Sequence, residues 1–165
     1  MKKVLVCFII AVSLIGMSCK STPAHPKIEG EVTQEKVNVA FEHIYETYRG
    51  KLDMTGAKDY TVAKGDSLSQ ITRNFYGSLT DVGTAGPNNG FYFPVIMLAS
   101  DNHGIVDPDL IEPGMKFKII DLKKNLANPA ARKAIKDSLI DIAYIYNKKG
   151  NKATEEGLIK LANSL

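Results

Sequence analysis

Two short blocks of sequence, residues 60–71 and 107–114, restrict the fold more than any other part of the chain. In the first block, Tyr60 and Val62 alternate with polar neighbours, which is typical of a short, half-buried strand. Gly65 follows directly and permits a tight turn. The first block therefore predicts a strand that ends in a turn.

A helix is predicted directly after this turn. Ser67 with Gln70 three residues later fits a capping box, and Asp66 is the alternative N-cap. Gly77 stands where a helix commonly ends. One apolar stripe at helical spacing consists of Leu68, Ile71, Thr72 and Phe75.

The second block predicts a return strand. Pro113-Gly114 is a turn signal, and after it Met115, Phe117 and Ile119 alternate with Lys116 and Lys118. Between the blocks, Pro94 can occupy the first turn of a second helix, with Val95, Ile96 and Leu98 covering the first helix. The order is strand, helix, helix, strand, so we expect an α+β fold with antiparallel strands and both helices on one face of the ribbon.

Together, the two blocks resemble the LysM family. The resemblance implies a LysM βααβ module, a two-stranded antiparallel sheet with two helices, over residues 59–121. Members of the family bind the N-acetylglucosamine-containing backbone of peptidoglycan or chitin in a shallow groove. The resemblance therefore implies a glycan-binding protein.

The resemblance also implies where the glycan binds, namely between the loop after the first strand and the loop before the second. Carried over by motif, the ligand-binding residues are Gly65, Asp66, Ser67, Leu68, Val106, Asp107, Pro108, Asp109, Leu110 and Ile111. Exposed backbone N–H and C=O groups would pair with the acetamide, and apolar side chains would pack against its methyl group and the sugar ring. Each loop also has a purely structural alternative. Asp66 and Ser67 would then only cap a helix, and Leu110 and Ile111 would only fill the core.

The connection over residues 78–90 is longer and richer in Gly and Asn than is usual in LysM domains. The βααβ order puts it at the pole opposite the groove, so it is predicted to be a mobile surface insertion that leaves the groove intact; contact with a partner is the alternative. Next to it, Phe93 is predicted to be buried. Tyr92 can be exposed, and the resemblance implies no ligand role for it. His103 is predicted to be a polar loop residue.

The start of the chain predicts export. A basic beginning and an apolar run too short to span a bilayer comfortably predict a secretory signal peptide over residues 1–18. The segment before Cys19 resembles a bacterial lipobox, with Gly16 where Leu is usual, which implies that Cys19 carries the lipid. The alternative is a plain cleaved signal that leaves Cys19 as an incidental thiol. The polar, proline-containing residues 19–32 are predicted to be a tether.

Amphipathic helices are predicted on both sides of the module, over residues 33–50 and as a hairpin over 128–165, where Asn128-Pro129 is a cap with a first-turn proline. Their apolar residues at helical spacing are Val37, Phe41, Ile44, Tyr45 and Tyr48, then Ile135, Leu139, Ile142 and Tyr146, then Leu158, Leu161, Ala162 and Leu165. We expect the three helices to pack as a small bundle or against the LysM module. The turn over 143–151 also resembles a tetratricopeptide repeat, but one helix pair cannot form a solenoid, which favours an ordinary hairpin.

Binding without catalysis is the predicted activity. His25, His43 and His103 are scattered, no hydrolase or paired-carboxylate motif is present, and neither a metal nor a cofactor is predicted. The net charge is +3, or +1 without Lys2 and Lys3, and no Lys/Arg run is dense enough to suggest nucleic acid.

We therefore expect an exported bacterial lipoprotein, anchored to a membrane through Cys19 and facing the periplasm or wall, that tethers the envelope to peptidoglycan. The alternative is an accessory or targeting protein for a wall enzyme or for envelope assembly, in which the helical flanks dock a protein partner.

Overall fold

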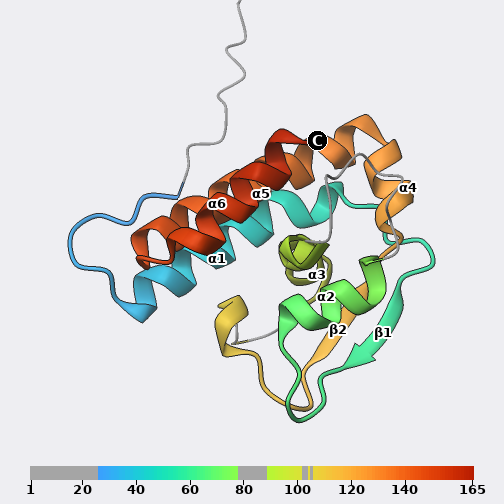
Figure 1. Cartoon of the computed structure of the whole chain (residues 1–165), viewed down its shortest axis with the longest axis horizontal. Helices are drawn as coiled ribbons and strands as arrows, with labels where there is room; N and C mark the ends of the chain where they lie inside the picture. The colour runs from blue at the N-terminus through green and yellow to red at the C-terminus, as the bar shows by residue number, and fades with distance from the viewer. Residues whose placement is uncertain (1–25, 78–88, 102–103, 105) are drawn as a thin grey trace, which may run out of the picture.

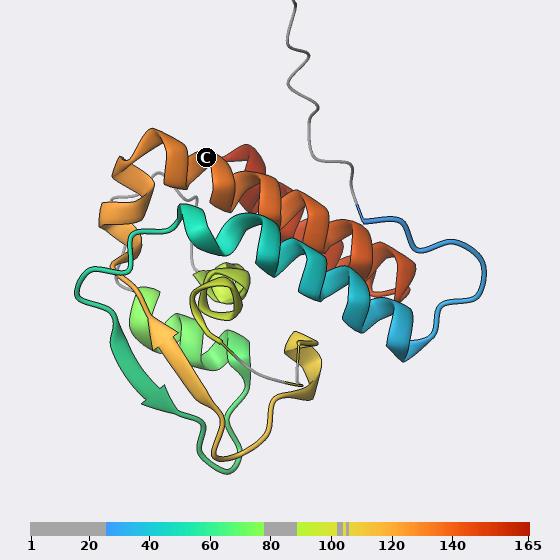
Figure 2. The same cartoon turned by 180° about the vertical axis from the view of Figure 1, so that it is seen from behind.

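The computed structural model describes residues 26–77, 89–101, 104 and 106–165. A two-stranded antiparallel sheet lies at one side of the molecule, helices α2 and α3 come next, and helices from the two ends of the chain cover α3 from the opposite side (Figures 1 and 2). The predicted α+β fold with its LysM βααβ order is confirmed.

The sheet consists of β1 (Lys58–Thr61) and β2 (Lys116–Ile119), which pair antiparallel with Tyr60 opposite Phe117. Exposed and buried residues alternate along β2, as the sequence predicts, and Phe117 is fully buried. The turn before β2 is closed by hydrogen bonds from the Val62 N–H to the Met115 carbonyl and from the Gly114 N–H to the Val62 carbonyl. These bonds hold the two loops of the predicted groove at the same end of the ribbon.

Helix α2 (Leu68–Tyr76) begins and ends where the sequence predicts, with Ser67 at the N-cap and Gly77 at the C-cap. The predicted capping box is wrong, because the Ser67 side chain makes no capping hydrogen bond. The stripe also differs at its last turn: Phe75 is 39% exposed, and Tyr76 is buried in its place.

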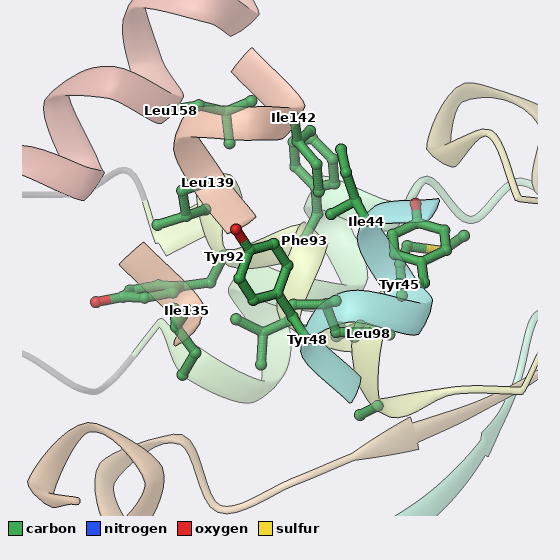
Figure 3. Packing of buried hydrophobic residues seen from close by; sticks show 14 of the residues in the cluster. Ile44, Tyr45, Tyr48, Tyr92, Phe93, Leu98, Ile135, Leu139, Ile142 and Leu158 are labelled. Carbon is green, nitrogen blue, oxygen red and sulfur yellow. The ribbon is translucent and has the colours of Figure 1, made fainter. Parts of the chain in front are cut away.

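Helix α3 (Phe93–Ala99) is buried along its whole length and follows a short 3₁₀ turn, η2 (Asn89–Tyr92). Pro94 occupies its first turn, as predicted, and Phe93 is buried. Tyr92 is also buried, and not exposed as the sequence allows. Its ring packs edge-on against the ring of Tyr76, with the centroids 6.5 Å apart. Figure 3 shows Phe93 between Ile44 and Ile142, so α3 is enclosed by the flanking helices.

The flanks form α1 (Gln34–Tyr48), the 3₁₀ turn η1 (Arg49–Lys51), α5 (Pro129–Lys148) and α6 (Lys152–Asn163). Thr33 caps α1, and the Asn128 side chain accepts from two N–H groups at the start of α5. The predicted apolar stripes of α1, α5 and α6 are buried except for the half-buried Leu165. Both expected packing modes occur together, since α1 and α6 contact α5 while α1 and α5 contact α3.

Two features lie outside the predicted scheme. A short helix, α4 (Leu122–Ala127), joins β2 to α5, and its buried Asn125 accepts from the Asp53 N–H at 2.8 Å and donates to the Asp53 carbonyl at 2.9 Å. Pro26 and Ile28 are buried, so the last residues of the predicted tether belong to the folded unit.

Some predictions fall on residues outside the described ranges. They concern the signal peptide, Cys19, most of the insertion over residues 78–90, and His103. Across the described ranges, no helix has both the length and the apolar character needed to cross a bilayer.

Candidate functional site

One cleft brings together the two loops that the sequence singles out. Its volume is about 410 Å³, which is within the range of sites that hold small ligands. The residues that line it are Asp66, Ser67, Leu68, Ser69, Arg73, Gly90, Phe91, Phe93, Pro108, Asp109, Ile111, Tyr146 and Thr154. They come from the start of α2, from η2 and α3, from the segment before β2, and from both helices of the C-terminal hairpin.

The predicted ligand-binding residues divide into two groups. Asp66, Ser67, Leu68, Pro108, Asp109 and Ile111 line the cleft, three from each loop. Gly65, Val106, Asp107 and Leu110 do not; the last three line a second hollow of about 400 Å³ that also contains Asn38. The glycan contacts of all ten stay a prediction, but only the first group joins residues of both loops in one cleft.

Asp66 fixes the first loop. Its Oδ2 accepts hydrogen bonds from the Tyr60 hydroxyl at 2.6 Å and from the Ala63 N–H at 2.8 Å. These bonds favour the ionised carboxylate, so the Tyr60 hydroxyl, and after it the Ala63 N–H, lower the pKa of Asp66. Gly65, at φ +93°, makes the turn that brings this carboxylate back toward β1.

Neither Asp66 nor Ser67 caps α2 through its side chain, so backbone N–H groups at the start of this helix are left without a capping acceptor. The N–H groups of Leu68 and Ser69 have no acceptor among the described residues. Both residues line the cleft. The first N–H groups of a helix have no partner within the helix itself, so they are available to an acceptor on a ligand.

The second loop is built around Asp107, whose side chain is 1% exposed. This carboxylate accepts from the Asp109 N–H at 3.0 Å and thereby caps the 3₁₀ turn η3 (Pro108–Leu110). Lys149 bonds both oxygens of Asp107 and reaches Asp109 Oδ2 at 2.5 Å. Burial opposes the charged form of Lys149, but the hydrogen bonds to the two carboxylates outweigh it and raise the pKa of Lys149.

Helices α1 and α5 add two further bonds to this loop. The Tyr45 hydroxyl donates to the Val106 carbonyl at 2.8 Å, and the Tyr146 hydroxyl donates to Asp109 Oδ1 at 2.8 Å. Burial, and after it the charge of Asp109, raises the pKa of Tyr146. The flanking helices therefore set the position of the second loop.

The C-terminal hairpin supplies a third wall of the cleft. Tyr146 of α5 and Thr154 of α6 line it, and Phe91 of η2 packs its ring against Gly157 of α6. No sequence motif implies a binding role for these residues. A glycine in the middle of a predicted helix is the one sequence signal for such close packing.

The last two residues of the 78–90 segment do not lie at the pole opposite the groove, where the segment is predicted to be. Asn89 and Gly90 belong to η2 and are buried, and Gly90 lines the cleft together with Phe91. This part of the chain therefore reaches the cleft instead of lying at the opposite pole. Residues 78–88 are outside the described ranges.

The exposure of Leu110 and Ile111 shows whether these apolar residues of the second loop only fill the core. Leu110 is 48% exposed, so it does not fill the core. Ile111 is half-buried, packs against the core and lines the cleft as well. Among the described residues, no group of three or more His, Cys, Asp or Glu side chains could hold a metal ion.

Comparison with known protein families identifies a LysM domain. The model of the LysM domain family matches residues 60–84, which include β1 after its first two residues and the whole of α2. LysM is a carbohydrate-binding domain and not a catalytic one. No curated protein and no solved structure matches the chain.

Proposed function

This chain is a LysM-domain protein, and on that premise we propose that the cleft between its two loops binds the N-acetylglucosamine-containing strands of peptidoglycan without cleaving them. LysM domains bind glycans that contain this sugar. The observation that carries the proposal is that three residues of each implied binding loop line one cleft. The identity of the glycan and the absence of catalysis in the whole chain belong to the proposal.

The chemistry of the cleft suits an N-acetylated sugar. The free N–H groups of Leu68 and Ser69 can donate to an acetamide carbonyl. Both hydrogen bonds to Asp66 end on Oδ2, so Oδ1 can accept from a sugar hydroxyl. Apolar surface for the methyl group and the sugar ring comes from Leu68, Phe91, Phe93, Pro108 and Ile111. A few convergent polar groups on an apolar wall are typical of small-ligand sites.

We further propose that the protein works at the bacterial cell envelope, anchored to a membrane by lipid on Cys19. The support is sequence alone: an apolar run of signal-peptide length that ends at a lipobox-like segment. Each CH₂ of an acyl chain that is buried in the membrane contributes about 0.8 kcal/mol to the free energy of membrane binding. A multiply acylated cysteine therefore anchors a protein for long periods. A weak glycan site then suffices, because a tethered module rebinds at high effective concentration.

Binding to purified sacculi tests the glycan site. We expect the full chain to sediment with sacculi and to release no soluble fragments. Thr154→Trp should fill the cleft from the hairpin side and abolish sedimentation. Ala153→Trp is the matched control, since Ala153 is exposed and does not line the cleft. Equal binding by both variants would show that the glycan does not occupy this cleft, and release of fragments would show an enzyme.

The anchor has its own test. Cells expressing the chain should incorporate labelled fatty acid into the wild type and none into Cys19→Ala, and the variant should leave the membrane fraction. Labelling of both proteins, or of neither, would exclude Cys19 as the lipid site.

The alternative is an accessory protein whose helical flanks dock a partner. Such a partner would contact the exposed faces of the flanks, because their apolar stripes are buried within this chain, as Val37, Ile142 and Leu158 illustrate. The helical flanks therefore have an internal role. No described feature favours a second function over glycan binding.

A further inference from the structure

Arg73 is a feature of the cleft that neither the sequence motif nor the loops explain. It lies four residues after Ser69 on α2, so both side chains are on the same face of the helix, and both line the cleft. Its side chain is exposed. The guanidinium lies close to Gly90: a Cβ built at Gly90 would be 2.9 Å from Nη1. Gly90 has no positive φ, and a Cβ built there would also be 3.4 Å from the Ser69 carbonyl oxygen.

The guanidinium of Arg73 has no ion pair or hydrogen bond with any described residue. Several other cations of the described chain are paired, such as Arg49 with Asp101 at 3.3 Å and Lys149 with Asp107 at 2.9 Å. The cleft carboxylates are engaged as well: Asp66 with Tyr60, and Asp109 with Lys149 and Tyr146. Arg73 is therefore a cation that lines the cleft and has its full donor capacity available.

On the basis of the proposed function, we infer that Arg73 recognises a carboxylate on the bound glycan, so that the cleft prefers peptidoglycan strands to chitin. A guanidinium binds a carboxylate through two parallel hydrogen bonds, which adds geometric selectivity. Chitin carries no carboxylate. Peptidoglycan offers two sources with the same chemistry, the lactyl group of muramic acid where its peptide is absent and the carboxylates of the peptide stem where it is present.

The effect should be modest. Exposed ion pairs contribute little because water screens them, so we expect a preference of about fivefold at low salt. Asp66 in the same cleft opposes an anionic ligand. Raising the ionic strength should reduce the preference, because screening weakens interactions between exposed charges.

Calorimetric titration of the full chain with three tetrasaccharides tests the inference. They are a chitin oligomer, a peptide-free peptidoglycan glycan and the same glycan with peptide stems. The wild type should bind at least one of the two carboxylate ligands about fivefold more tightly than the chitin oligomer. Arg73→Gln should remove this difference, because it should weaken binding of the carboxylate ligands about fivefold more than binding of the chitin oligomer. Arg132→Gln is the matched control, since Arg132 is exposed on α5 and does not line the cleft.

The outcomes separate this inference from the proposed function. If the wild type binds all three ligands equally, or Arg73→Gln weakens all three equally, carboxylate recognition is wrong while glycan binding stands. If none of the three binds, glycan binding itself fails. A preference for the peptide-free strand alone identifies the lactyl group, and a preference for the stem-bearing strand alone identifies the peptide. Should Arg73→Gln not fold, a wild-type preference that does not fall with added salt overturns the inference.

Discussion

Lys149 at the end of α5 bonds both carboxylate oxygens of Asp107, at 3.0 and 2.9 Å, across the junction between the C-terminal hairpin and the loop before β2. The Asp107 side chain is 1% exposed and that of Lys149 is 19% exposed, so this ion pair is largely removed from water. Gln34 of α1 adds a hydrogen bond to the same carboxylate at 2.9 Å. Residues from both flanking helices thus converge on one aspartate of the LysM loop.

Removal of the Lys149 side chain should destabilise the protein strongly. Lys149→Ala leaves the buried Asp107 charge without its cation, and breaking a buried pair in this way costs about 3 kcal/mol. Urea unfolding measures the change. Lys148→Ala is the control, because Lys148 is exposed and a surface substitution changes stability by about 0.5 kcal/mol or less. A loss for Lys149→Ala no larger than this control would show that the pair does not stabilise the junction.

Gly157 should tolerate no side chain. A glycine within a helix usually gains about 0.5–1 kcal/mol of stability when replaced by alanine. Here the added Cβ would collide with the ring of Phe91, so we expect Gly157→Ala to destabilise by about 1–3 kcal/mol instead. Phe91→Ala should relieve the collision, so the double variant should be no less stable than Phe91→Ala alone. A stabilising Gly157→Ala would contradict the observed packing of Phe91.

Two buried tyrosines should respond in opposite ways to loss of their hydroxyl groups. The Tyr92 hydroxyl is buried and has no hydrogen-bond partner among the described residues, so Tyr92→Phe should leave stability unchanged or raise it by about 1 kcal/mol. The Tyr146 hydroxyl donates to Asp109, so Tyr146→Phe should cost about 1–2 kcal/mol. Urea unfolding of both variants tests this. Equal losses would show that the Tyr92 hydroxyl has a partner.

Local signals in the sequence predict most of the helix and strand boundaries. Asn128 accepts capping hydrogen bonds where a cap is predicted, and the alternation along 115–119 gives β2 its buried face. These features depend on residues a few positions apart, which is why a single sequence reveals them. The βααβ order follows from them, and the family match agrees with it.

The end of α2 shows where local periodicity fails. Spacing alone predicts a buried Phe75, yet Tyr76 is buried in its place. The reason is tertiary: the Tyr76 carbonyl accepts from Asn89 at 2.6 Å and its ring contacts Tyr92, both of η2. Phe75 instead packs edge-on against Tyr60, with the ring centroids 5.5 Å apart.

The third wall of the cleft could not be predicted for the same reason. Tyr146 reaches Asp109 across 37 residues of sequence, and no periodic pattern encodes that contact. The packing of Phe91 on Gly157 spans an even longer stretch of chain. The motif therefore identifies the two loops, whereas the hairpin that encloses them becomes visible only in three dimensions.

Acid should loosen the loop after β1 through Asp66. Hydrogen bonds from Tyr60 and Ala63 lower the pKa of this carboxyl below its ordinary value of 3.8. Since the folded state favours the ionised form, Asp66 contributes stability that is fully present above pH 3.8 and is lost as the pH falls through the lower pKa of the folded state. Asp66→Asn, which cannot ionise, removes this dependence.

Thermal unfolding between pH 6 and pH 2.5 measures this contribution. The wild type should unfold at a higher temperature than Asp66→Asn at pH 6, because hydrogen bonds to a charged acceptor are stronger. The difference should shrink below pH 3.8 as the wild-type carboxyl becomes protonated. Asp59→Asn is a suitable control, since Asp59 pairs with Lys118 on the exposed side of the sheet and lies outside the cleft. A difference that stays constant down to pH 2.5 would mean that ionised Asp66 does not stabilise the loop.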